Sequence, residues 1–152
     1  MADFACFGYE LDLTKMSESE LAECRAFTKR RRTLDKYVLS GNFYKLNVDN
    51  DYYYACLQVA EDKSSALFTF VQLDAQIRYE SVIVKLKGLD PAARYRIGAN
   101  GQILYGRTLE KAGLKISDLL CPHWKTEDAL RISLARGKSG SGISFEIVRT
   151  DD

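Results

Sequence analysis

The sequence predicts a mainly β protein: an antiparallel, Greek-key-like β-sandwich of about seven strands, preceded by one long N-terminal α-helix. Two observations support this fold class. Apolar residues recur at helical spacing before residue 41 and alternate with a period of two after it. Turn signals also separate the short apolar runs of the second part. A chain of 152 residues fits one domain with or without an appendage. Because the period changes near residue 41, we divide the chain into residues 1–40 and 41–152.

The first forty residues predict a loop or strand followed by a helix. Residues 4–13 indicate either a short strand or an ordered loop packed by its aromatic side chains. The helix begins at a capping box, with Ser17 as the N-cap and Glu20 as the third helical residue. We expect it to end at Ser40 and Gly41, with Gly41 in the C′ position that glycine favours. One apolar stripe follows the helix: Leu21, Cys24, Phe27, Leu34 and Val38.

The rest of the chain predicts the strands of the sandwich. The expected strands cover residues 52–59, 66–73, 82–87, 95–97, 103–105, 130–134 and 143–147. Residues 66–73 are apolar on both faces, which is typical of a central strand. Asn100 and Gly101 predict a hairpin with a type I′ turn, and residues 108–112 predict one helical turn closed by Gly113. Since no low-complexity linker occurs, we expect the helix and the sandwich to pack together directly.

Composition argues against several kinds of partner. Lys and Arg total 22 and Asp and Glu total 21, and this net charge of +1 argues against nucleic acid. No apolar run approaches the roughly 20 residues of a membrane helix, and we see no signal peptide. The cysteines lack metal-ligand spacing, so we interpret them as reduced thiols of a cytoplasmic protein. They are Cys6, Cys24, Cys56 and Cys121.

The basic run at residues 29–32 has two interpretations. It could be a nuclear-localisation or nucleic-acid-binding patch. It could also be the solvated end of a surface helix, where positive charge complements the helix dipole. Because the chain as a whole has no basic excess, we favour the second interpretation.

The search for catalytic chemistry finds no constellation. Cys121 and His123 stand two positions apart in a proline-containing loop, where a Cys–His nucleophilic pair rarely forms. A glycosidase needs two carboxylates in one pocket, but nothing in the sequence ties any two candidate aspartates together. The candidates are Asp49, Asp51, Asp62, Asp74 and Asp90. The Gly-Lys-Ser string at residues 137–139 lacks the glycine spacing of a phosphate-binding loop. We therefore expect no catalytic residue, no metal site and no cofactor.

The tyrosines Tyr52, Tyr53 and Tyr54 are open to two interpretations. Exposed aromatic faces can stack on the apolar C–H edges of sugar rings. Alternate tyrosines also pack the two faces of a sandwich strand, which we favour. Carbohydrate-binding residues are therefore left unassigned.

Five strings stand in a distinctive order, at residues 7–13, 41–46, 59–67, 86–96 and 106–114. Together they resemble the α-galactosidases of glycoside hydrolase family 36 over roughly residues 7–116. The first string resembles the end of the family's catalytic barrel, and the second resembles the segment that leaves it. The other three are similar to the motifs V-x-E-D-K-S-x-A-L, L-K-G-L-D-P-x-x-x-Y-R and G-x-x-L-x-x-A-G-L of its C-terminal domain. Beyond about Leu120 the likeness fades, and residues 121–138 have no counterpart that we can name.

The resemblance implies a retaining α-galactosidase that releases terminal α-galactose from sugars such as melibiose and raffinose. Such enzymes carry a nucleophilic and an acid/base aspartate on a (β/α)8 barrel, about 5 Å apart. The strings that hold these aspartates are absent here, so no catalytic residue is carried over. Residues 1–40 then correspond to a remnant of the barrel's end, and residues 41–152 to the C-terminal β-sandwich. We expect a fragment, a truncated gene product or an isolated domain.

Three functions follow as hypotheses. The first is a non-catalytic domain that braces a catalytic barrel, the partner missing here, and contributes to homo-oligomer contacts. The alternative is a stand-alone carbohydrate-binding β-sandwich module, which would bind galactosides saturably. The third is a subunit that completes a split enzyme together with a separately encoded barrel.

Overall fold

The computed structural model describes residues 12–48, 51–73, 82–116 and 141–150. A short 3-10 helix, η2 (Leu13–Lys15), precedes the helices α1 (Glu18–Thr33) and α2 (Asp35–Val38), and α3 (Gly106–Lys111) lies among the strands. The strands are β1 (Asn42–Leu46), β2 (Tyr53–Val59), β3 (Ser65–Gln72), β4 (Ile83–Val84), β5 (Arg94–Ile97), β6 (Ile103–Tyr105), β7 (Leu114–Lys115) and β8 (Ser141–Thr150). Helix therefore gives way to strand at residue 42, as the change of period predicts.

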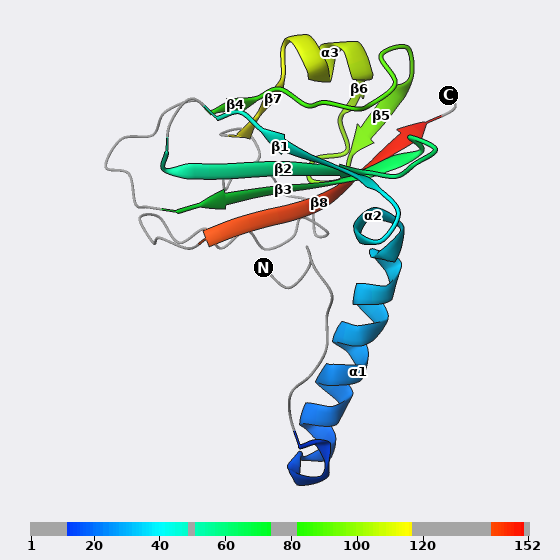
Figure 1. The fold of residues 1–152 in the computed structure, drawn as a ribbon, viewed down its shortest axis with the longest axis vertical. Coiled ribbons are helices and arrows are strands. Elements are labelled where there is room, and N and C mark those ends of the chain that lie inside the picture. The colour runs from blue at the N-terminus through cyan, green and yellow to red at the C-terminus, as the bar shows by residue number, and fades with distance from the viewer. Residues whose placement is uncertain (1–11, 49–50, 74–81, 117–140, 151–152) are drawn as a thin grey trace.

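The strands form one large and one small antiparallel sheet (Figure 1). The large sheet has the order β1-β2-β3-β8-β5-β6, and β4 pairs with β7 in the small one. The last strand, β8, lies between β3 and β5, so the chain returns to the middle of the sheet as in a Greek key. The predicted fold class is confirmed.

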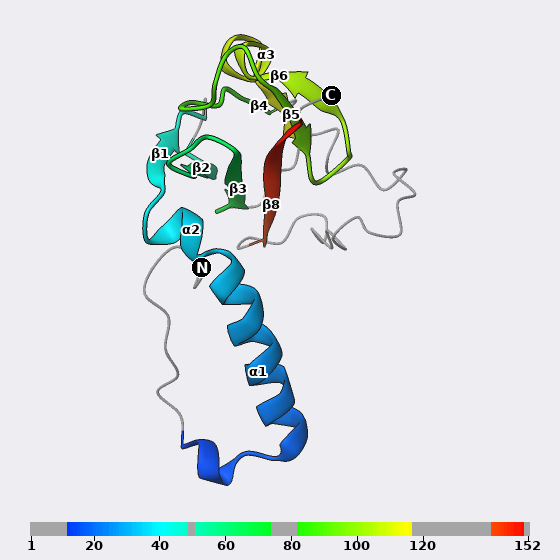
Figure 2. The same ribbon diagram turned by 90° about the vertical axis from the view of Figure 1, so that its right-hand side faces the viewer.

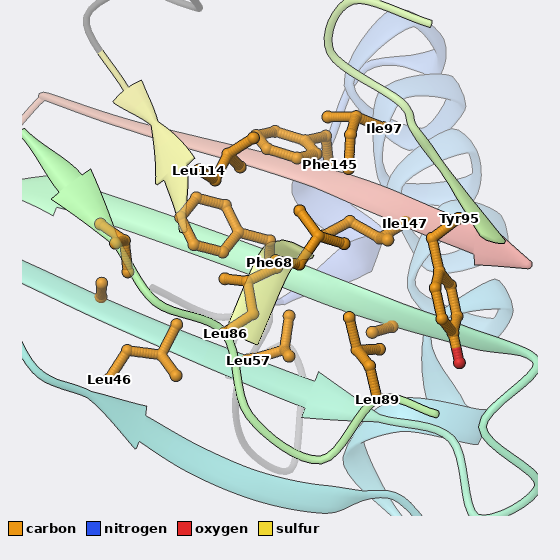
Figure 3. Packing of buried hydrophobic residues seen from close by; sticks show 14 of the residues in the cluster. Leu46, Leu57, Phe68, Leu86, Leu89, Tyr95, Ile97, Leu114, Phe145 and Ile147 are labelled. Atoms are coloured by element: carbon orange, nitrogen blue, oxygen red, sulfur yellow. The ribbon is translucent and has the colours of Figure 1, made fainter. Parts of the chain in front are cut away.

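The main core lies between the inner face of the large sheet and a second layer made of β4, β7, α3 and the segment after β4 (Figure 3). Inward-facing aromatic rings fill its centre, with the Phe68 and Phe145 centroids 5.1 Å apart. Leu86, Leu109 and Leu114 of the second layer are fully or nearly fully buried against them. Burial along β3 covers both faces from Ser65 to Phe70, which confirms a central strand.

The start of α1 confirms the predicted capping box. The Glu20 backbone N–H donates to Ser17 Oγ at 3.4 Å, and the Ser17 backbone N–H donates to Glu20 Oε2 at 2.8 Å. These reciprocal bonds satisfy donors that the first helical turn leaves unpaired. Hydrogen bonds from Ser17 also lower the pKa of the Glu20 carboxyl.

The end of the predicted helix is wrong in two respects. Instead of one helix to Ser40, α1 stops at Thr33, Leu34 forms its cap, and the separate turn α2 follows. Gly41 has no positive φ, so it is not the left-handed C′ residue that we expected. Glycine is needed there for space, because a Cβ would lie 2.4 Å from the Tyr37 backbone oxygen and 2.8 Å from that of Val59.

The expected direct packing of helix on sandwich holds only for α2. Leu34 and Tyr37 pack against Ala60 and Leu67 in a second, small buried cluster. Beyond this joint, α1 extends away from the sheet, as two perpendicular views show (Figures 1 and 2). The sequence pattern could not predict this, because an apolar stripe indicates burial without naming what buries it.

The predicted hairpin is confirmed, but its turn is not of type I′. A type I′ turn needs a positive φ at both central residues, and only Gly101 has one, at +72°. The Gly101 N–H donates to the Ile97 oxygen at 2.7 Å, and the Ile97 N–H donates to the Gln102 oxygen at 2.8 Å. The turn is therefore longer than two residues. The helical turn after β6 is confirmed, with Gly113 at φ +84° closing it.

Other predicted segments are confirmed in part or lie outside the described residues. Burial alternates from Ile83 to Leu86 as predicted, although β4 itself covers only two residues. In β8, Ile143, Phe145 and Ile147 are all buried. The strand expected at residues 130–134 and most of the segment at residues 4–13 lie outside the described residues.

Candidate functional site

Three of the family-like strings meet at one end of the large sheet. The turn between β2 and β3 is closed by the Ala60 N–H, which donates to the Ser65 oxygen at 2.9 Å, and it holds Lys63 at φ +56°. Asp62 Oδ1 accepts hydrogen bonds from the Ser64 N–H at 2.9 Å and from Ser64 Oγ at 2.7 Å. These bonds lower the pKa of the Asp62 carboxyl. The carboxylate thus shapes the turn.

Tyr95 joins this turn to the string at residues 86–96. Its ring is fully buried, and its hydroxyl donates to the Lys63 backbone oxygen at 2.9 Å. The same hydroxyl accepts a hydrogen bond from the Asp90 backbone N–H at 3.0 Å. Burial raises the pKa of the Tyr95 phenol. The tyrosine of one string therefore anchors the backbone of another.

The string at residues 106–114 forms backbone hydrogen bonds with the string at residues 86–96. The Gly106 N–H donates to the Ala93 oxygen at 2.9 Å, and the Leu86 N–H donates to the Leu109 oxygen at 3.0 Å. A Cβ on Gly106 would lie 2.1 Å from the Asp90 oxygen, so only glycine allows this approach. The strings are thus structural contacts of one another.

The joint between helix and sheet lies at this end as well. Tyr37 of α2 is fully buried, and its hydroxyl donates to Glu146 Oε1 at 2.8 Å. Lys36 Nζ lies 3.8 Å from the same carboxylate oxygen and 4.6 Å from the centroid of the Tyr37 ring. Burial raises the pKa of the Tyr37 phenol. A polar contact between residues 109 positions apart therefore fastens α2 to β8.

The basic run at residues 29–32 is only partly solvated. Lys29, Arg30 and Arg32 are exposed as expected, but Arg31 is 5% exposed. Its Nη1 lies 2.7 Å from Asp35 Oδ1. The expectation of a solvated run is therefore wrong for Arg31, because the break at Leu34 turns the chain and buries this guanidinium beside α2.

Two of the candidate aspartates, Asp62 and Asp90, accept hydrogen bonds from the backbone of their own turns. Asp90 Oδ1 accepts from the Ala92 N–H at 3.0 Å, and its Oδ2 lies 3.5 Å from Arg149 Nη1. Asp62 and Asp90 both act electrostatically on Tyr95, so the fold brings them to one region, which the sequence did not indicate. A general acid needs a raised pKa, whereas that of Asp62 is lowered. Asp51 is exposed in a turn, and Asp49 and Asp74 lie outside the described residues.

The three tyrosines do not share one exposed face. Tyr52 is 43% exposed, whereas Tyr53 packs toward the core with its centroid 5.2 Å from that of Phe70. Tyr54 is half-buried on the next position of the strand, and burial raises the pKa of its phenol. This arrangement favours the packing interpretation over a stacking platform for sugars.

Other sequence candidates fall partly outside the described residues. Cys24 and Cys56 are thiols outside any disulfide, while Cys6, Cys121, His123 and residues 137–140 lie outside the description. Among the described residues, no group of three or more His, Cys, Asp or Glu side chains could hold a metal ion. In the same part of the chain, no helix has the length and apolarity needed to cross a membrane.

The exposed side of α1 is the other candidate surface. Leu21 and Cys24 are half-buried and Phe27 is 39% exposed, so part of the apolar stripe lies at the surface. Glu18 and Glu20 begin the helix, and Arg30 and Arg32 end it. Sequence reasoning found this stripe but missed Tyr37 and Tyr95 as anchors, since their partners are distant in sequence. A tyrosine in a buried periodic position is the signal that could have marked them.

Comparison with known proteins gives one consistent answer. A family model described as the glycosyl hydrolase family 36 C-terminal domain matches residues 53–130. The match passes residue 120, so our expectation that residues 121–138 lack any counterpart is wrong up to residue 130. Probable α-galactosidase C of Aspergillus flavus is 30% identical over 110 residues, which cover 72% of this chain and 14% of the relative. α-Galactosidase C of Emericella nidulans is 34% identical over 112 residues, with coverage of 72% and 14%.

A solved structure agrees. The crystal structure of the family 36 α-galactosidase AgaA from Geobacillus stearothermophilus superposes with a TM-score of 0.69 and 25% identity. The superposition covers 95% of this chain and 18% of AgaA. This chain thus spans less than a fifth of the length of each of these relatives.

Proposed function

We propose a structural role for this chain, which belongs to glycosyl hydrolase family 36 and contains the C-terminal domain of that family. In this proposal the domain is non-catalytic and braces the catalytic barrel of a retaining α-galactosidase. The parent enzyme would hydrolyse terminal α-galactosides such as melibiose and raffinose. Support comes from relatives that are named α-galactosidases and are several times longer than this chain.

The single observation that carries the proposal is helix α1, which extends away from the sheet (Figures 1 and 2). Its 16 residues span about 24 Å at 1.5 Å per residue. Isolated helices of about this length are marginal in water, and helices in proteins gain most of their stability by packing an apolar face. Among the residues that the structure describes, Leu21 is only half-buried and Phe27 is 39% exposed, so part of this apolar face remains at the surface. A catalytic barrel that covers this remaining surface would stabilise the helix further.

The joint with the sheet makes α1 suitable as a brace. Buried Leu34 and Tyr37 seat α2 on the sheet, and the Tyr37–Glu146 hydrogen bond adds a polar contact. The buried Arg31 guanidinium then pairs with Asp35, whose side chain is 43% exposed, and this pair connects the last turn of α1 to α2. Removing Asp35 would take this partner from a buried charge, which favours the observed arrangement of the joint.

The proposal divides the chain into two parts. Residues 1–40 would be the remnant of the end of a (β/α)8 barrel, and residues 41–152 the β-sandwich. The start of β1 at Asn42 and the family match from residue 53 support this boundary. The partner is then the catalytic barrel, and no catalytic residue is assigned to this chain.

The first test is enzymatic. The chain alone is expected to release no product from an aryl α-galactoside. Turnover by the purified chain that a galactose-mimicking inhibitor abolishes would overturn the non-catalytic assignment. A contaminating enzyme is excluded by showing that the activity elutes with this chain.

The second test addresses the brace. A family 36 catalytic barrel expressed without its own C-terminal domain should bind this chain. Leu21→Asp places a carboxylate in the stripe and should abolish binding, while Ala22→Asp, at an exposed position of α1 outside the stripe, should not. Equal effects of the two variants, or no binding by the unchanged chain, would count against α1 as the contact.

Homo-oligomer contacts belong to the same proposal. Ile103, Tyr105 and Val148 are 41%, 54% and 43% exposed. Register pairs Arg96 with both Ile103 and Val148, and Arg94 with Tyr105, so these apolar groups stand beside arginines on the sheet. Interfaces are enriched in such aromatic and arginine side chains. Light scattering of the purified chain tests for a dimer or larger species, and a monomer at all concentrations would remove this part.

A cytoplasmic location completes the proposal. It rests on the thiols of Cys24 and Cys56, which suit a reducing compartment. Fractionation of the source cells, followed by immunodetection of the chain, tests the location.

A further inference from the structure

A groove of about 460 Å³ lies beside the β5–β6 hairpin. Its lining comes from the β5–β6 hairpin, from α3 and from the segment that enters β7. This volume lies within the range of about 300–1,000 Å³ that small-ligand sites occupy. The lining residues are Asn100, Gln102, Leu104, Thr108, Gly113, Leu114 and Lys115.

Two polar side chains of the lining, Asn100 and Gln102, are joined by hydrogen bonds. Asn100 Oδ1 accepts from the Gln102 backbone N–H at 2.9 Å, and Asn100 Nδ2 donates to Gln102 Oε1 at 3.4 Å. The Gly113 N–H donates to the Thr108 backbone oxygen at 3.1 Å, where the chain passes from α3 into β7. Ordering these groups in advance lowers the entropic cost of binding.

The chemistry of the lining fits hydroxyl groups. A side-chain amide has two N–H donors and an acceptor oxygen with two lone pairs, so the Asn100 and Gln102 side chains keep capacity beyond their mutual bond. The Thr108 hydroxyl both donates and accepts, and the Lys115 ammonium donates. Leu104 and buried Leu114 add apolar surface. Sugars present hydroxyls in their ring plane and C–H groups on their ring faces, which matches polar walls with apolar surface between them.

From this lining we infer that the groove binds a neutral, hydroxyl-rich ligand, such as one or two sugar rings. Among the lining residues that the structure describes, none is acidic and Lys115 is the single cation. An anion such as phosphate could not use the acceptor oxygens of the two amides, which favours a neutral ligand. The inference goes beyond the bracing role and stands whether or not α1 binds a barrel.

The experiment is a titration of the full chain with galactose and with raffinose, followed by NMR of backbone amides. We expect saturable shifts at Gln102, Thr108 and Lys115 with a dissociation constant on the order of 1 mM. The double variant Gln102→Ala with Thr108→Val should weaken binding by about tenfold, since it removes two neutral hydrogen-bonding groups. The matched control is Thr33→Val on α1, where binding should not change. Thermal unfolding confirms that each variant is folded.

Four outcomes would overturn the inference. They are the absence of shifts with either sugar, equal binding by the folded double variant, loss of binding in Tyr52→Ala with the groove intact, and shifts at the groove with sodium phosphate alone. The third would assign sugar binding to the tyrosines, and the fourth would make the groove an anion site. None of them bears on the contact between α1 and a barrel.

Discussion

Tyr95→Phe tests whether one buried hydroxyl stabilises the contact between the family-like strings at residues 59–67 and 86–96. The substitution keeps the ring in the core and removes only the oxygen that contacts the Lys63 carbonyl at 2.9 Å and the Asp90 N–H at 3.0 Å. Each net hydrogen bond contributes about 1 kcal/mol, and a partly buried N–H left without a partner adds further cost. We therefore expect the free energy of unfolding to fall by about 2–3 kcal/mol.

The measurement is thermal and urea unfolding of the full chain. For a chain of about this size, 1 kcal/mol corresponds to roughly 2–4 °C, so the unfolding midpoint should fall by about 4–12 °C. The matched control is Tyr105→Phe, because Tyr105 is 54% exposed and should change stability by less than about 0.5 kcal/mol. A Tyr95→Phe protein as stable as the unchanged chain, or equal losses in both variants, would refute the reasoning.

Three further predictions concern single side chains. Tyr37→Phe should lower the free energy of unfolding by about 1–2 kcal/mol, because the Glu146 carboxylate loses its 2.8 Å donor; no loss in urea unfolding would contradict this. Asp62→Ala should destabilise the chain at neutral pH. The folded pKa of Asp62 lies below its unfolded value, so the stabilisation by this carboxylate is present above about pH 4 and is lost as the pH falls through the folded pKa. The free energies of unfolding of the variant and of the unchanged chain should therefore converge in acid, and a difference that stays constant would contradict this prediction. Burial raises the pKa of the Cys56 thiol to about 11, so a thiol reagent at about pH 8 should modify Cys56 only after unfolding, and rapid labelling of the native chain would be inconsistent with its burial.

Local patterns predicted most elements because their causes are local. The capping box at Ser17 and Glu20 needs only neighbouring residues, and the structure contains it as predicted. The same holds for the helical turn closed by Gly113 and for the buried alternation in β8. The turn at Asn100 and Gly101 is the local failure, because several turn types accept this dipeptide and the strands on either side select among them.

The candidate surfaces could be predicted only in part. The stripe Leu21, Cys24 and Phe27 was visible as a helical period, but periodicity carries no information about the surface that covers it. Tyr37, Glu146 and Tyr95 were not predicted as anchors, since each contact joins segments that are distant along the chain. The groove at Gln102 and Lys115 also depends on how the β5–β6 hairpin, α3 and β7 meet, which no short pattern encodes.

By itself, the sequence determined the fold class, the change from helix to strand near residue 41 and the likeness to family 36, because period, turn residues and motif order are properties of the chain. Only the tertiary structure decided that α1 extends from the sheet while α2 docks on it, that Arg31 is buried, and that Gly41 is required for space. Those outcomes depend on which surfaces meet after folding. Burial of a charge or the approach of two backbones is set by long-range packing, which neighbouring residues cannot specify.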